Sequence, residues 1–199
     1  MPTKWMKRFR ESGQLTVCNK AGAWTSAVDG AMNTFNNLGL GLKLVAEKDE
    51  MEANIIVKMS SGSETYKRYD DTITVNFPAE KMHGKAVTRA HPRLKEIYLA
   101  VVFLPGKVQN LTPKQREVVI VHELLHASGL DGGRGDGTQD PGMDHDIIGV
   151  MAGQMAIDGD GLIEYLHEKG TKPMTPIRVG AQTMCKMRLL WAGEACQHN

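Results

Sequence analysis

A pair of histidines in a strongly apolar stretch constrains this chain more than any other feature. His122 and His126 lie four residues apart, and Glu123 follows the first, in a run that also contains Val118, Val119, Ile120, Val121, Leu124 and Leu125. In a helix, residues at this spacing project from one face, so both imidazoles can reach one metal ion. Because burying such polar groups among apolar ones is costly without a partner, the pattern predicts a zinc-binding helix. Glu123 is then placed to polarise a zinc-bound water.

The alternative is a chance match in an amphipathic helix whose histidines are satisfied by ordinary hydrogen bonds. The boundaries of this helix are well marked. Thr112-Pro113-Lys114-Gln115 supplies a capping threonine, a proline at the first helical position and a glutamine three residues after the cap. Gly129 is expected to end the helix.

The remaining pattern predicts strands and two further helices around this element. Strands are expected at 14–18, 42–46, 53–59, 72–77 and 97–104, and helices from Thr25 or Ser26 to about 38 and from Thr175-Pro176 to 191. Residues 60–64 and 131–146 are expected to be loops, the second rich in glycine and aspartate. The strand at 72–77 ends at Pro78, which is typical of a strand at a sheet edge.

Length and composition indicate one globular domain. The 199 residues are 41% hydrophobic and 24% charged, with a formal net charge of +1, which gives no case for nucleic acid as a partner. We expect a single domain over 1–199, with an N-terminal part at about 14–130 and a C-terminal part at about 131–193. No signal peptide or membrane-spanning segment is recognised, so the expected location is cytoplasmic, virion-associated or outside the cell by a non-classical route.

The three cysteines, Cys18, Cys185 and Cys196, form no C-x-x-C motif and no disulfide framework. Cys185 and Cys196 could pair across the last helix, whereas free buried thiols are equally compatible with the sequence. The pairing therefore stays open.

The chain resembles the metzincin clan of zinc peptidases in its order of elements, with the histidine helix followed by a glycine turn and a later methionine. Within this clan it is most similar to matrixin-type catalytic domains. The likeness extends from about 14 to 193, and further segments that share it are Trp24-Thr25, Ala53-Asn54-Ile55-Ile56-Val57 and Arg188-Leu189-Leu190-Trp191-Ala192-Gly193. The resemblance implies an α+β fold, with a twisted mixed sheet of about five strands, an active-site helix and a C-terminal helix. It also implies that His122 and His126 bind zinc, that Glu123 is the general base, and that Met151 lies beneath the metal. Core packing is the other interpretation of Met151.

The third zinc ligand departs from the compact pattern of this clan. Three residues after Gly129 stands Gly132, which has no side chain to offer, and Asp131 lies one position early. Gly142-Met143-Asp144-His145 repeats the spacing that closes the motif in matrixins, so His145 is the preferred ligand, after an insertion at 130–141 like that of leishmanolysin-like members. Asp131 is the first alternative, and the others are Asp136, Asp140, Asp144 and Asp146.

The resemblance implies hydrolysis of a peptide or protein substrate by a zinc-activated water. Thr72, Thr74 and Asn76 would contact an extended substrate if their strand is the cleft-side edge, and residues 153–165 would set specificity. No tyrosine ligand is expected, because Gly153 occupies that position. Two alternatives remain: a zinc hydrolase that cleaves peptidoglycan, and a zinc-bound structural component of a larger assembly such as a phage virion.

Calcium is a weaker hypothesis than zinc. Aspartates recur at Asp136, Asp140, Asp144, Asp146, Asp158 and Asp160. The glutamate that would close an EF-hand loop falls on His167, and glycine and aspartate are also common turn residues. The sequence therefore favours turns over a Ca²⁺ site.

Overall fold

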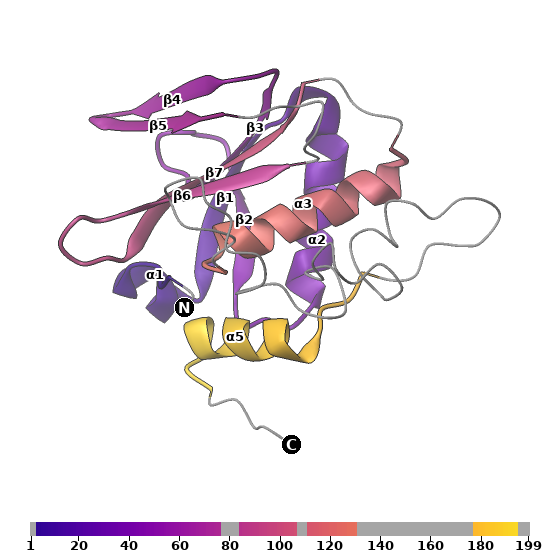
Figure 1. Ribbon diagram of the computed structural model, residues 1–199. Helices are drawn as coiled ribbons and strands as arrows, with labels where there is room; N and C mark the ends of the chain where they lie inside the picture. Colours follow the sequence, from indigo (N-terminus) through magenta and orange to yellow (C-terminus); the bar gives the residue numbers. More distant parts are fainter. Residues whose placement is uncertain (1–2, 77–83, 107–110, 131–176, 195–199) are drawn as a thin grey trace.

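The computed structural model describes residues 3–76, 84–106, 111–130 and 177–194. Its central element is a five-stranded sheet with the order β2-β1-β3-β7-β6, in which the first four strands are parallel and β6 is antiparallel to β7. The elements are α1 (Lys7–Ser12), β1 (Gln14–Lys20), the 3-10 helix η1 (Gly22–Trp24), α2 (Thr25–Asn37), β2 (Lys43–Glu47), β3 (Ile55–Ser60), β4 (Glu64–Arg68), β5 (Asp71–Val75), β6 (Lys85–Ala90), β7 (Ile97–Pro105), α3 (Pro113–Ala127) and α5 (Ala181–Trp191). Figure 1 shows their arrangement.

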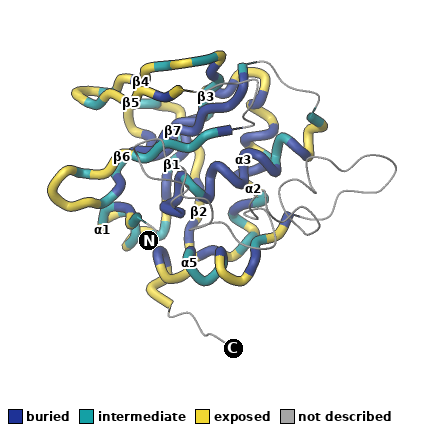
Figure 2. The backbone as a smooth tube through the Cα atoms, in the orientation of Figure 1, coloured by how far each residue is buried: buried dark blue, intermediate teal, exposed yellow. Residues whose placement is uncertain are grey.

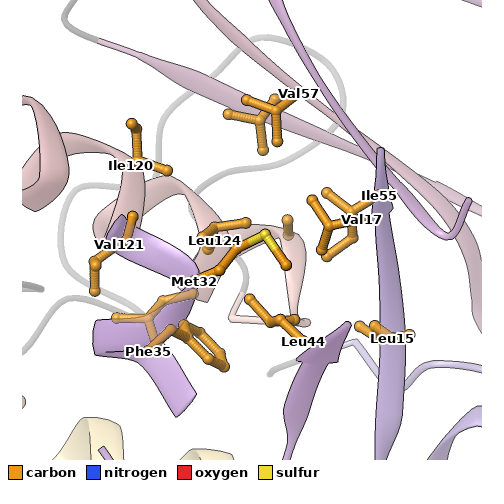
Figure 3. Packing of buried hydrophobic residues seen from close by; sticks show 14 of the residues in the cluster. Leu15, Val17, Met32, Phe35, Leu44, Ile55, Val57, Ile120, Val121 and Leu124 are labelled. Carbon is orange, nitrogen blue, oxygen red and sulfur yellow. The ribbon is translucent and has the colours of Figure 1, made fainter. Parts of the chain in front are cut away.

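The two faces of the sheet are covered by different elements. Alternate residues of the inner strands, such as Ile55 and Val57 on one side and Ile56 on the other, enter two separate hydrophobic clusters. The larger cluster joins the sheet to α2, α3 and α5, and Figure 3 shows Met32 and Phe35 of α2 meeting side chains of α3 and the sheet. The smaller cluster lies under the β4–β5 hairpin. Burial on both faces explains why β3 and β7 are almost continuously apolar.

Helix α3 is buried along most of its length, as Figure 2 shows by its dark colour. Its N-terminus has the predicted capping box: the Thr112 hydroxyl accepts from the Gln115 N–H, and the Gln115 side chain accepts from the Thr112 N–H. Gly129 follows the helix with φ of 112°, a value that favours glycine. The predicted boundaries of this helix are therefore confirmed.

The α+β class, the sheet of about five strands, the histidine helix and the C-terminal helix are all confirmed. The prediction for 72–77 was wrong in one respect. Residues 72–75 belong to β5 of a two-stranded hairpin, β4–β5, and the edge strand of the five-stranded sheet on the side of α3 is β6. Neither β4 nor β6 was predicted from the sequence. The last helix begins at Ala181, and Thr175 and Pro176 lie outside the described residues.

Two further predictions concern the cysteines and the membrane. Cys185 is disulfide-bonded, Cys18 is a buried free thiol, and Cys196 lies outside the described residues. Within the described ranges, no helix combines the length and apolar character needed to cross a membrane.

Candidate metal centre

The two histidines of α3 converge on one point. His122 Nε2 lies 3.2 Å from His126 Nε2, and the ring centroids are 4.7 Å apart with planes at 80°. Two nitrogens bound to one tetrahedral zinc at about 2.0–2.1 Å are separated by about 3.3 Å. The observed spacing is compatible with a shared zinc ion, and equally with a direct N–H···N hydrogen bond between the two rings.

The outer nitrogen of His126 fixes which nitrogen faces the metal position. His126 Nδ1 lies 2.9 Å from the carbonyl oxygen of Leu130, which can only accept, so Nδ1 carries the hydrogen. In the neutral ring, the lone pair is then on Nε2, where it can bind a metal or accept from the Nε2–H of His122. A backbone carbonyl in this position is the usual outer partner of a zinc-bound histidine.

Glu123, the residue after His122 in α3, is buried and has an unusually high pKa. The residue is 7% exposed, and burial raises the pKa of its carboxyl group from 4.5 to about 7. The Ala86 N–H, which donates to the carboxylate, and the positive charge of Lys85 act in the opposite direction. A carboxylate with a pKa near neutrality is suited to taking and giving a proton.

The C-terminal end of α3 is held by both ends of the described chain. Trp5 Nε1 donates to the Ala127 carbonyl at 2.9 Å, and Trp191 Nε1 donates to the Ser128 carbonyl at 3.0 Å. The Thr3 N–H donates to the Gly129 carbonyl at 3.0 Å. These donors satisfy carbonyls that a helix end otherwise leaves without partners. They fix the turn that carries His126 and Leu130.

Replacing Trp5 or Trp191 with phenylalanine should weaken zinc binding roughly tenfold, because each change frees a carbonyl in that turn. Stability should fall by about 1–2 kcal/mol. Trp24→Phe is the matched control, since Trp24 Nε1 also makes a buried bond, to Pro105 at the end of β7. Competition titration with a zinc indicator, together with urea unfolding, separates the two effects. Equal loss of zinc affinity in all three variants would contradict the role of the helix end.

The third ligand and the methionine fall outside the described residues. This is the case for His145, Asp131, the alternatives Asp136, Asp140, Asp144 and Asp146, and Met151. Within the described ranges, no group of three or more potential ligands is assembled. The structure brings the imidazoles of His122 and His126 together, and Glu123 follows His122 in the same helix.

The remaining candidates lie apart from these three residues. Thr72, Thr74 and Asn76 are exposed on the β4–β5 hairpin, which covers the face of the sheet opposite α3. These three residues were expected on the cleft-side edge strand of the sheet, and in the structure that edge strand is β6. His91 lies in the turn before β7, where its Nδ1 accepts from the Arg93 and Leu94 N–H groups.

No family model matches the sequence, and no curated protein matches it. Among solved structures, the chain is similar to high choriolytic enzyme 1, a hatching-enzyme zinc-protease from the medaka Oryzias latipes. The identity is 13% over 96% of this chain and 94% of that chain, with a TM-score of 0.41. At this distance the likeness assigns no activity to this chain.

Sequence reasoning missed the strand that covers Glu123. Gly84 is buried against the Glu123 side chain, and the next residues, Lys85 and Ala86, supply the charge and the N–H that act on its carboxylate. The sequence offers one short indication of this strand: Gly84 is followed by the small residues Ala86, Thr88 and Ala90 at alternate positions.

Proposed function

We propose that the chain is a zinc-dependent endopeptidase of the metzincin type. The observation that carries this proposal is the 3.2 Å separation of the Nε2 atoms of His122 and His126, with the buried carboxyl group of Glu123 on the residue after His122. His122 and His126 would hold the zinc with a third ligand from the segment after α3, for which His145 is preferred. Bound zinc would supply a water of lowered pKa and polarise the scissile carbonyl.

Glu123 would perform the proton transfers. Its carboxylate takes the proton of the attacking water and passes it to the nitrogen of the leaving amine. Both transfers require a group that is ionised at the start and readily reprotonated, which is why a pKa near neutrality is favourable. The Ala86 N–H holds the carboxylate in place between the two transfers.

Strand β6 is the candidate platform for an extended substrate. It is an edge of the five-stranded sheet and contacts α3 at Glu123. A peptide could pair with such an edge through main-chain hydrogen bonds, while pockets beside the strand select side chains. The sequence predicted that an extended substrate would contact Thr72, Thr74 and Asn76. We propose instead that it pairs with β6.

The cost of burying Glu123 argues against a purely structural zinc site. A structural site needs ligands alone, and a carboxyl group whose pKa is raised by burial reduces the stability of the folded state at neutral pH. Retaining such a group is expected where it takes part in a reaction.

Zinc content of the protein purified without added metal tests this proposal. We expect about one zinc per chain, lost in His145→Ala and retained in Asp131→Ala, measured by mass spectrometry of metals. His91→Ala is the control for removal of a histidine outside the centre, and it should keep the metal. A wild-type protein that carries no zinc, and takes up none on titration, would refute the proposal. Zinc without cleavage of peptides or peptidoglycan would favour a structural component.

A further inference from the structure

Gly84, the residue immediately before β6, is in closer contact with Glu123 than any side chain would allow. A Cβ atom added to Gly84 would lie 2.7 Å from Glu123 Cγ, 3.0 Å from Oε1 and 3.1 Å from Cδ. Carbon atoms in van der Waals contact are about 3.5–4.0 Å apart, so the glutamate or the strand would have to move.

Backbone conformation does not explain the glycine. The φ of Gly84 lies outside the left-handed region, unlike that of Gly129, so a left-handed backbone is not the reason for a glycine there. All three nearest atoms belong to Glu123. The need for glycine at this position is therefore a need for space beside that one side chain.

The close approach also delivers a hydrogen-bond donor. Ala86, two residues along the same strand, donates its N–H to the Glu123 carboxylate. A side chain at Gly84 would move the strand away from α3 or turn the carboxylate away from this donor. Either movement displaces the group that must meet the attacking water.

We propose that Gly84 is a positioning residue for Glu123: its missing side chain lets the start of β6 lie against the glutamate, so that the Ala86 N–H holds the carboxylate in its reactive place. The inference rests on the proposed function, because it assigns the position of the general base. The contact between Gly84 and Glu123 can nevertheless be tested without metal or substrate.

The first test is the kinetics of Gly84→Ala. A displacement of about 1 Å in a catalytic group lowers turnover on the order of 100-fold. We expect that loss in kcat, with KM and zinc content near the wild-type values. Gly62→Ala is the matched control, since Gly62 also precedes a strand, has no left-handed φ and has no atom within 4 Å of an added Cβ. It should retain kcat within about twofold. A Gly84→Ala enzyme with unchanged kcat would overturn the proposal.

The second test is a double-mutant cycle on the unfolding of the metal-free protein, with Gly84→Ala and Glu123→Ala. Gly84→Ala should raise the unfolding constant about tenfold when Glu123 is present, and this effect should disappear in the Glu123→Ala background. Equal effects in both backgrounds would show that the collision is with something else, and would overturn the inference. Absence of zinc and activity from the wild type would instead refute the proposed function, while the cycle would still report on the contact.

Discussion

Glu123→Gln should lower kcat for peptide cleavage by about 10³-fold while the protein keeps its zinc. Glutamine has nearly the same size and can still accept from the Ala86 N–H, but it cannot take a proton from water. The measurement is turnover of a fluorogenic peptide library, with metal content determined on the same preparation. Loss of zinc in this variant would mean that the glutamate supports the metal site as a whole, and turnover at the wild-type level would eliminate Glu123 as the base.

The same variant should be more stable than the wild type when the metal is removed, and the gain should depend on pH. Burial raises the pKa of Glu123 from 4.5 to about 7, so the folded state holds this proton more tightly than the unfolded state. Ionisation therefore favours unfolding as the pH rises from about 4.5 to 7, and the full cost of about 3 kcal/mol is present above 7. Urea unfolding with a chelator should show a large gain for Glu123→Gln at pH 8 and little at pH 4.5. Equal gains at both pH values would contradict this origin.

The second large effect is expected at the ligands. His126→Ala should abolish stoichiometric zinc binding, because it removes one of the two Nε2 atoms that lie 3.2 Å apart. It also removes the imidazole ring whose orientation is fixed by the hydrogen bond to the Leu130 carbonyl. His122→Ala should do the same. Wild-type protein should unfold at a higher temperature with zinc than with chelator, since a metal that binds only the folded state stabilises it. In the His126→Ala protein, that difference should be absent.

A His126→Ala protein that still binds one zinc per chain with wild-type affinity would place the metal elsewhere. His91→Ala is the matched control, because it removes an imidazole engaged only in a turn. The comparison distinguishes loss of a ligand from a general effect of deleting a histidine.

Features with a strong local signal could be predicted from the sequence. The capping box at Thr112, the apolar run around the histidines and the glycine at 129 each specify their conformation within a few residues. The spacing of His122 and His126 predicted that their rings share a face, and the structure places their nitrogens together.

Strand β6 could not be predicted in the same way. Apart from Val87 its residues are polar or small, and they are partly buried or exposed, so they show no alternation of burial. Its extended form is stabilised by antiparallel pairing with β7, a partner that the local pattern does not reveal. The hairpin turn was missed for a related reason: Tyr69 has a φ of 50° there, a conformation for which a tyrosine gives no signal.

The tryptophan bonds at the end of α3 have a consequence for how the protein matures during synthesis. Trp5 is 122 residues before the carbonyl that it caps, and Trp191 is 63 residues after its own. A nascent chain that has already formed α3 still lacks the second donor until α5 is made and docked. Since contacts between distant segments form late in folding, the turn that carries His126 becomes rigid near the end of the process. An immature chain would therefore have a looser turn at the end of α3 than the finished protein.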